Sequence, residues 1–555
     1  MSKKLLVSYY FIYKQFARLN QFENLQKGGS IGGKVNIKWN TFHHNGVMFP
    51  KDYVPHKIPV IYHGQEVILD SEAEEYATIF VRYIDSDYYK DNKFKKNFWK
   101  DWQKILGKKH IIQDLEGCDF KLIYKYVLEL REQKLTLSKA EKEKIKEIKE
   151  KETEKYKTAY IDGKPQPVGN YLVEPPSIFI GRGCHPFIGK IKKRIYPEDI
   201  TLNLSKDATI PKLEHNHKWG SIVHEKNSVW LASWKDIITG KTKYVWLSDK
   251  SEMKAQGDLD KFETARRLKK HIKAIRVKNN ENLISSDQST RQLATALYFI
   301  DNFALRVGNE KGEDEADTVG VVSLRVEHIE QLDNNEIKLD FLGKDSVRYV
   351  KTVKVDELVY KNLQDFTQNK SKNDDIFNKI KTSDVNDYLK TLMTGLTAKV
   401  FRTYNASNLF ADELDSVSKK YENYTKDDKF DLLLDGFNKA NAKVALLCNH
   451  QKNISKNFSE QTNKIKNQLK ELKQKKKEAK NPSKLKDRIN KLKIKLDLKQ
   501  ELKNLSLGTS KINYIDPRIT VSFMKKHNLE IDKIFNKSLQ EKFKWAFEVD
   551  ENFTF

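Results

Sequence analysis

The sequence predicts an α+β protein of several structural units, with a mixed α/β part first and a mostly helical part after it. The chain has 555 residues, which is too many for one ordinary hydrophobic core, so two to four units are expected. Short apolar segments separated by turn residues occupy much of the first 250 residues, whereas apolar residues at helical spacing dominate from Phe262 onward. A lysine-rich stretch with apolar stripes then precedes a short C-terminal part.

Residues 1–34 are interpreted as a short leader, because they end in a flexible joint, Gly28-Gly29-Ser30-Ile31-Gly32-Gly33. The apolar run Leu5–Tyr13 superficially resembles a signal peptide, but it contains tyrosine and serine and lacks a clear small-residue cleavage site. No apolar run approaches the roughly 18 to 20 residues of a membrane span, so no membrane attachment is expected.

Residues 35–250 are predicted to form a mixed α/β unit. Short strands are expected from Ile37 to Asp70, followed by a helix from Ala73 to Tyr83 and by an aromatic cluster of Phe94, Phe98, Trp99 and Trp102. The Lys-Glu pairs of residues 130–158 indicate a long exposed helix pair, which we interpret as a solvated face in preference to a dedicated DNA contact. Strands at Ser228–Trp234 and Lys243–Leu247, with a turn at Ile238–Lys241, predict a hairpin.

Residues 251–452 are predicted to form a second, mostly helical unit, interrupted by strands at Thr318–Ile329 and Ile337–Val355 with a turn at Gly343–Ser346. Residues 453–505 predict an antiparallel coiled coil, since two apolar stripes flank a break at Asn481-Pro482-Ser483. The stripes are Ile465, Leu469 and Leu472, then Leu485, Ile489, Leu492 and Leu496. Residues 506–555 are a small C-terminal unit.

The charge balance points to a polyanionic partner. Lysine and arginine number 102 against 77 aspartates and glutamates, a formal net charge of +25, and nucleic acid is therefore the first candidate. The three cysteines show no short-range pairing, which argues against a disulfide framework or a zinc ribbon. No Gly-x-x-x-x-Gly-Lys loop occurs, so no ATP requirement is expected.

One C-terminal stretch contains a candidate nucleophile. Gly508, Asn513 and Pro517 punctuate the chain around Tyr514, which predicts that this tyrosine lies beside a turn or a helix start. A phenol with a pKa of about 10 is a poor nucleophile, so attack on a phosphodiester would require cationic groups from elsewhere in the chain. Taken alone, Tyr514 is one of 24 tyrosines, and a packed ring is the favoured interpretation of an arbitrary tyrosine.

Five segments, in order, resemble motifs of the eukaryotic type IB DNA topoisomerases. They are Tyr298–Lys311, Phe341–Tyr349, Leu396–Ser407, Leu447–Gln451 and Ser510–Val521. The resemblance covers about residues 37–555. It implies a cap over duplex DNA, a tyrosine-recombinase-like catalytic lobe, a coiled-coil linker and a C-terminal domain that together form a clamp round DNA.

The resemblance also implies the catalytic residues. Arg306 and Arg402 would stabilise the phosphate, His450 would donate to a nonbridging oxygen, Lys344 would protonate the departing 5′ oxygen, and Tyr514 would become linked to the DNA 3′ end. Two guanidiniums are suitable for this task because they are planar, always charged and bidentate. The implied activity is relaxation of positive and negative supercoils by single-strand cleavage, strand rotation and religation, without ATP or a divalent metal.

Further expectations follow from the same resemblance. Arg182, Asp345, Lys399 and Asn513 are predicted DNA contacts, and Arg182, Asp345 and Asn513 are also predicted to contact camptothecin-type drugs. Double-stranded DNA is the expected partner, and a nuclear monomer active in replication and transcription is the expected state. Two departures are noted: the charged N-terminal extension typical of the family is not seen, which leaves nuclear targeting without an identified signal, and Ile180 stands where the family commonly has a second arginine.

The sequence is also compatible with two other functions. A tyrosine recombinase would share the catalytic fold, but recombinases usually carry His-x-x-Arg at the second arginine, where this chain has Lys399-Val400-Phe401-Arg402. A non-catalytic basic scaffold for nucleic acid would have no need for all five catalytic positions.

Overall fold

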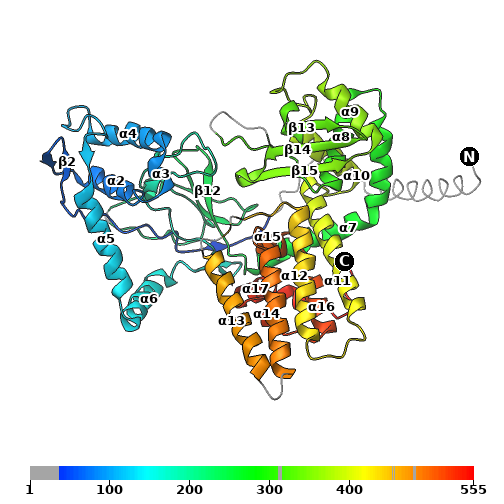
Figure 1. The fold of residues 1–555 in the computed structure, drawn as a ribbon. Helices are drawn as coiled ribbons and strands as arrows, with labels where there is room; N and C mark the ends of the chain where they lie inside the picture. Colours follow the sequence, from blue (N-terminus) through cyan, green and yellow to red (C-terminus); the bar gives the residue numbers. More distant parts are fainter. Residues whose placement is uncertain (1–36, 215, 310–314, 453, 455–456, 479–482) are drawn as a thin grey trace, which may run out of the picture. The chain divides into compact units, whose positions relative to one another are not determined.

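The computed structural model describes residues 37–214, 216–309, 315–452, 454, 457–478 and 483–555 (Figure 1). These residues form two compact units, each described by itself. Unit 1 contains residues 37–254 with Glu315 and Ala316, and unit 2 contains residues 255–309 and the described residues from Asp317 onward. The predicted leader, residues 1–34, lies outside the described part. Both units combine helices with small sheets, so the mixed α/β character is confirmed.

Unit 1 contains four small sheets with the strand orders β1-β5-β6, β3-β2-β4, β7-β8 and β10-β9-β11-β12. The predicted hairpin is confirmed, because β11 and β12 pair antiparallel with Trp234 opposite Lys243. The strands are β1 (Phe42–His43), β2 (Val60–Tyr62), β3 (Gln65–Val67), β4 (Cys118–Asp119), β5 (Thr158–Ile161), β6 (Lys164–Pro167), β7 (Ser177–Ile178), β8 (Ile191–Lys192), β9 (Thr201–Asn203), β10 (Ser221–Val223), β11 (Trp230–Lys235) and β12 (Thr242–Trp246).

The helices predicted in unit 1 are present, and they begin earlier than the side-chain periodicity indicates. Asp70 starts the first one by accepting a hydrogen bond from the Ala73 amide, and the predicted aromatic cluster packs beneath it, with the rings of Phe80 and Phe98 stacked at 4.0 Å. The exposed helix pair is confirmed and starts earlier than expected, at Lys121. The helices are α2 (Ser71–Val81), α3 (Asp87–Lys90), α4 (Asn92–Leu106), α5 (Lys121–Thr136), α6 (Lys139–Glu154) and a 3₁₀ turn at Pro197–Asp199.

Unit 2 is mostly helical around one large apolar cluster. The helix α7, whose residues 252–254 are assigned to unit 1, begins at Glu252 and not near Phe262, because its N-terminal turns are polar and carry no apolar stripe that would mark them in the sequence. The helices are α7 (Glu252–Leu283), α8 (Gln288–Asn302), α9 (Glu357–Thr367), α10 (Thr382–Leu392), α11 (Ala398–Lys420), α12 (Lys429–Leu447), α15 (Leu507–Asn513), α16 (Pro517–Lys526) and α17 (Lys537–Lys542), with 3₁₀ turns at Ile531–Lys533 and Lys544–Glu548.

One three-stranded sheet belongs to unit 2: β13 (Ile329–Leu332), β14 (Glu336–Leu342) and β15 (Arg348–Lys354), in that order. The hairpin of β14 and β15 is confirmed. The strand predicted at Thr318–Ile329 is wrong, because this segment forms 3₁₀ turns at Val321–Ser323 and Val326–His328. The amides of Val321 and Val322 donate hydrogen bonds to the carbonyls of Arg306 and Val307. The backbone of this segment therefore finds its hydrogen-bond partners in a neighbouring loop and not in a strand.

The predicted helix pair is present as α13 (Phe458–Glu478) and α14 (Ser483–Glu501), which lie side by side (Figure 1). Ile465, Leu469 and Ile489 are buried between them, and Leu472, Leu492 and Leu496 pack against this seam, as the stripes predict. The break at Asn481-Pro482 lies outside the described residues. A salt bridge of 2.7 Å joins Lys491 of α14 to Asp431 of α12. Over the ranges described above, no helix has both the length and the apolar content that crossing a membrane requires.

Candidate active site

Tyr514 lies between two helices of unit 2. It follows the last residue of α15, and Asp516 then begins α16 by accepting a hydrogen bond from the Arg518 amide, with Pro517 in the first turn. The expectation that Tyr514 lies beside a turn is confirmed. Gly508, however, does not interrupt the chain: it is the second residue of α15, at a helix start where a glycine costs less than in a helix interior.

The backbone around Tyr514 is held from two sides. The Ser407 hydroxyl, on α11, donates to the Tyr514 carbonyl and accepts from the Asp516 amide, both at 3.0 Å. Asp516 is fully buried and pairs with Arg518 at 2.7 Å, and Arg518 in turn pairs with Glu263 of α7. These contacts hold the backbone around Tyr514 against α11 and α7.

Three of the predicted catalytic groups surround the Tyr514 ring. The guanidinium carbon of Arg402 lies 4.9 Å from the ring centroid, and the His450 ring stacks at 5.2 Å with an interplanar angle of 27°. The Nη2 atom of Arg402 is 3.3 Å from His450 Nε2. The charge of Arg306 also acts on the Tyr514 side chain and helps to lower the pKa of its phenol. Residues far apart in the sequence therefore converge on one phenol.

The charges of this cluster change the acidity of its members. Burial alone would raise the pKa of Tyr514, but the charges of Arg402 and Arg306 outweigh it and hold the pKa below its ordinary value. Burial, reinforced by the same two arginines, lowers the pKa of His450 to about 3. At neutral pH the histidine is uncharged, and the tyrosine is easier to ionise than a free phenol.

Arg402 is anchored through one edge of its guanidinium. Its side chain is buried and donates to the backbone carbonyls of Ala304 and of Cys448, the latter at 2.9 Å. Its Nε atom is buried without a hydrogen-bond partner among the described residues. An unpaired buried donor costs free energy, and an anionic oxygen bound here would satisfy it.

Arg306 lies in a loop that depends on two glycines. Gly308 has a φ of +95°, which favours glycine, and a Cβ on Gly320 would lie 2.4 Å from the Gly308 Cα. This close approach lets the Val321 amide reach the Arg306 carbonyl at 2.9 Å. The two glycines thus fix the backbone from which the first arginine extends.

Lys344 lies on the turn between β14 and β15, with its side chain exposed. Together with Arg306 and Arg402 it lines a small hollow of about 30 Å³. The turn is unusual, because Asp345 and Ser346 both have left-handed backbones with φ of 68° and 57°, a conformation that costs non-glycine residues free energy. All five predicted catalytic residues lie in unit 2.

The remaining predicted contacts are exposed. Asp345 follows Lys344 in the hairpin turn, Asn513 ends α15, and Lys399 lies in the first turn of α11, one turn before Arg402. Arg182 belongs to unit 1, in a turn where Gly181 and Gly183 both have positive φ. Ile180 beside it is 38% exposed, so this apolar side chain occupies a surface position.

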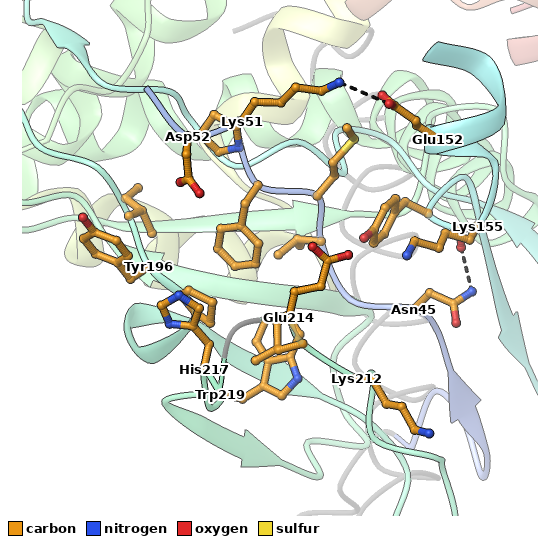
Figure 2. A pocket seen from close by; sticks show the side chains of 18 of the residues that line it. Asn45, Lys51, Asp52, Glu152, Lys155, Tyr196, Lys212, Glu214, His217 and Trp219 are labelled. Atoms are coloured by element: carbon orange, nitrogen blue, oxygen red, sulfur yellow. Dashed lines mark hydrogen bonds and ion pairs between the residues drawn. The ribbon is translucent and has the colours of Figure 1, made fainter. Parts of the chain in front are cut away.

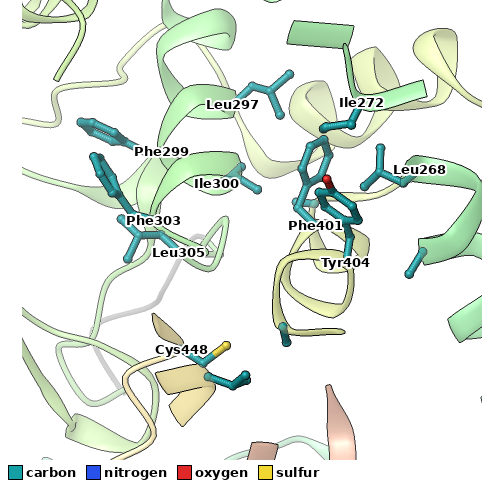
Figure 3. Close-up of a cluster of buried hydrophobic side chains, with 14 of the residues drawn as sticks. Leu268, Ile272, Leu297, Phe299, Ile300, Phe303, Leu305, Phe401, Tyr404 and Cys448 are labelled. Atoms are coloured by element: carbon teal, nitrogen blue, oxygen red, sulfur yellow. The ribbon is translucent and has the colours of Figure 1, made fainter. Parts of the chain in front are cut away.

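The hydrophobic core of unit 2 anchors the neighbours of the predicted catalytic residues (Figure 3). Leu305 precedes Arg306, Phe401 and Tyr404 flank Arg402, and Cys448 lies two residues before His450; all four are buried in the same cluster. Because a close-packed interior is hard to deform, the backbone at these positions is held firmly in place. The predicted catalytic groups therefore extend from a close-packed support.

A wider hollow of about 590 Å³ lies in unit 1 (Figure 2). It contains both signs of charge: Lys51 pairs with Glu152 at 3.1 Å, and Asp52 and Glu214 add further carboxylates. This mixture is poorly suited to a phosphate group. In the part of the chain that the structure describes, no three His, Cys, Asp or Glu side chains gather closely enough to hold a metal ion. The cluster around Tyr514 is therefore the candidate site.

Several residues that support the site have no sequence pattern that would reveal their role. Ser407 and Ser510 lie inside the recognised motifs, but a serine carries no pattern of its own, and only its contacts show what it does. Gly320 could have been noticed as a glycine between apolar residues, which signals close backbone approach.

A phenol next to two guanidiniums and a neutral imidazole defines a class of site that can bind a phosphodiester and transfer it to tyrosine. Models of one known protein family match three successive parts of the chain. The DNA-binding fragment of eukaryotic DNA topoisomerase I matches residues 37–247, its catalytic core matches residues 250–483, and the C-terminal topoisomerase domain matches residues 486–555.

Several relatives align over nearly the whole chain. DNA topoisomerase 1 alpha of Arabidopsis thaliana is 43% identical over 98% of this chain and 62% of its own length. DNA topoisomerase 1 of Homo sapiens is 41% identical over 94% of the chain and 72% of its own length, and that of Caenorhabditis elegans is 43% identical over 94% and 68%. The chain thus spans about three fifths of the Arabidopsis relative. It belongs to the eukaryotic DNA topoisomerase I family.

Proposed function

We propose that this protein is a type IB DNA topoisomerase. It cleaves one strand of double-stranded DNA through a 3′-phosphotyrosyl bond to Tyr514, lets the strand rotate and religates it, relaxing positive and negative supercoils. The observation that supports this most directly is the contact of Tyr514 with Arg402 and His450, within the influence of the Arg306 charge, in a chain of this family. The reaction needs neither ATP nor a divalent metal, because the arginines supply the positive charge.

The proposed roles follow from the chemistry of each group. Arg306 and Arg402 bind the nonbridging oxygens, and the unpaired Nε of Arg402 is one donor for them. Neutral His450 adds a hydrogen bond to a nonbridging oxygen. The Tyr514 oxygen forms a bond to phosphorus as the bond to the 5′ oxygen breaks, and Lys344 protonates that leaving oxygen. Religation is the reverse of these steps.

The finer architecture is part of the same proposal. Residues 35–250 are the DNA-binding cap, residues 251–452 the catalytic core, residues 453–505 the linker and residues 506–555 the C-terminal domain, together a clamp round DNA. The net charge of +25 supports a duplex partner bound mainly through its phosphates. Arg182, Lys399, Asp345 and Asn513 are the proposed DNA contacts. The protein acts as a monomer in the nucleus.

The test is relaxation of plasmid DNA by the purified protein in EDTA without ATP. We expect complete relaxation of both positively and negatively supercoiled plasmid, with religated product. A product that recombines two sites would instead favour a tyrosine recombinase, and binding without any change in linking number would favour a non-catalytic scaffold. The Lys399–Arg402 segment, which lacks the usual recombinase histidine, supports the topoisomerase.

A drug response is also expected. Two of the three predicted camptothecin contacts, Asp345 and Asn513, lie in unit 2 with Tyr514 and have exposed side chains. A planar ligand stacked between base pairs needs polar contacts at its edge to fix its orientation. Camptothecin should increase the amount of covalently cleaved DNA, and Asn513→Ser should reduce this increase several-fold while much of the relaxation activity remains.

Gel separation of cleaved and intact DNA across a wide drug range would measure this response. Asn528→Ser, which changes an asparagine just beyond α16, is the matched control and should respond like wild type. Equal amounts of cleaved DNA with and without drug in the wild-type protein would disprove the drug-contact assignment and leave the catalytic one intact.

A further inference from the structure

The Ser510 side chain directly contacts His450. Ser510 is fully buried on α15, four residues before Tyr514, and its hydroxyl oxygen is 2.7 Å from His450 Nδ1. The Ser510 carbonyl accepts the amides of Tyr514 and Ile515, and the His450 carbonyl accepts the Ser506 amide at 2.8 Å. The same short helix thus carries the nucleophile and a hydroxyl bound to the histidine.

The partners of the imidazole determine where its proton lies in the ligand-free site. A guanidinium can only donate, so Arg402 Nη2, at 3.3 Å, makes His450 Nε2 an acceptor. Burial and the neighbouring arginines lower the pKa of His450 to about 3, so the ring is neutral and carries one proton. That proton lies on Nδ1 and is donated to the Ser510 hydroxyl.

A bound phosphodiester requires the opposite arrangement. A nonbridging oxygen only accepts hydrogen bonds, so the imidazole can stabilise it only with the proton on Nε2. Nδ1 then becomes a buried acceptor that needs a donor. A serine hydroxyl can accept or donate by rotating, so it serves the ring in both states without any movement of the heavy atoms.

We propose that Ser510 is a positioning residue that lets His450 change tautomer when the phosphodiester binds. Its hydroxyl accepts from Nδ1–H in the free site and donates to Nδ1 once Nε2–H points at the phosphate. The inference rests on the proposed function, since it assigns His450 to the nonbridging oxygen. It predicts an effect on the cleavage step and none on the assembly of the fold.

Single-turnover cleavage of a nicked duplex, which traps the covalent adduct, measures this step. Ser510→Ala should slow adduct formation about 10- to 100-fold, because the buried Nδ1 then lacks its donor in the reacting state. Ser510→Thr keeps the hydroxyl and should restore most of the rate. Ser522→Ala removes another buried hydroxyl of the C-terminal unit, one that donates to the Glu551 carbonyl at 2.8 Å, and should cleave like wild type. Thermal unfolding midpoints confirm that all three variants fold.

A double-mutant cycle separates this role from general damage to the site. In a His450→Ala background, Ser510→Ala should cause no further loss of rate, because the serine acts only through the imidazole. An equal loss in both backgrounds, or a wild-type rate in the Ser510→Ala variant, would overturn the inference while the wild-type protein still cleaves DNA. If the wild-type protein forms no adduct at all, the proposed function is wrong, and the inference about Ser510 is then wrong as well.

Discussion

Replacing Tyr514 with phenylalanine should abolish cleavage and relaxation of DNA while leaving DNA binding close to wild type. The ring packs against His450 and Arg402, and the backbone is held by Ser407, so phenylalanine preserves every contact except those of the hydroxyl. In the proposed mechanism the hydroxyl oxygen is the atom that attacks phosphorus. Its removal should lower the rate of adduct formation by a factor on the order of 10⁴ or more.

Three measurements check this result: covalent adduct on a denaturing gel, plasmid relaxation, and affinity for an uncleaved duplex. Tyr388→Phe is the matched control, since its hydroxyl accepts from Asn282 at 2.7 Å within unit 2 and takes no part in the site. It should relax DNA normally. Adduct formed by the Tyr514→Phe protein would show that a different residue is the nucleophile and would refute the assignment made here.

Lys344→Ala should produce the second large effect, and that effect should depend on the leaving group. Lys344 lines the same hollow as Arg306 and Arg402 and is proposed to protonate the departing 5′ oxygen. Loss of a general acid typically costs 10²- to 10⁴-fold, so cleavage of an ordinary phosphodiester should slow by about that factor. A 5′-phosphorothiolate leaves as a stable thiolate without protonation, and its cleavage should change little.

The comparison of the two substrates distinguishes a general-acid role of Lys344 from a role in positioning DNA. Lys351→Ala, an exposed lysine on β15 of the same hairpin, is the control for loss of charge and should cleave both substrates like wild type. If Lys344→Ala slowed both substrates equally, the lysine would position DNA and would not act as the acid. The left-handed turn at Asp345 and Ser346 would then be a device for presenting a phosphate contact.

Sequence patterns predicted the elements whose signal is local and repeated. The stripes of Ile465 and Leu469 predicted the helix pair, because a seam between two helices must recur at heptad spacing. The same logic failed at Thr318–Ile329, where buried apolar residues belong to 3₁₀ turns. Apolar residues indicate that a segment is buried, but they do not fix its backbone conformation. The conformation of Thr318–Ile329 depends on hydrogen bonds to the loop of Arg306, which is a separate segment of the chain.

The sequence by itself determined the family of the chain and predicted which side chains carry out the proposed phosphoryl transfer, because those residues lie in long, specific motifs. The tertiary structure brought Arg306, Arg402, His450 and Tyr514 to one place, by packing Leu305, Phe401 and Cys448 into a single core. It also decided the protonation states. The lowered pKa values of His450 and Tyr514 depend on burial and on charges from distant segments, and a linear sequence contains neither distances nor solvent.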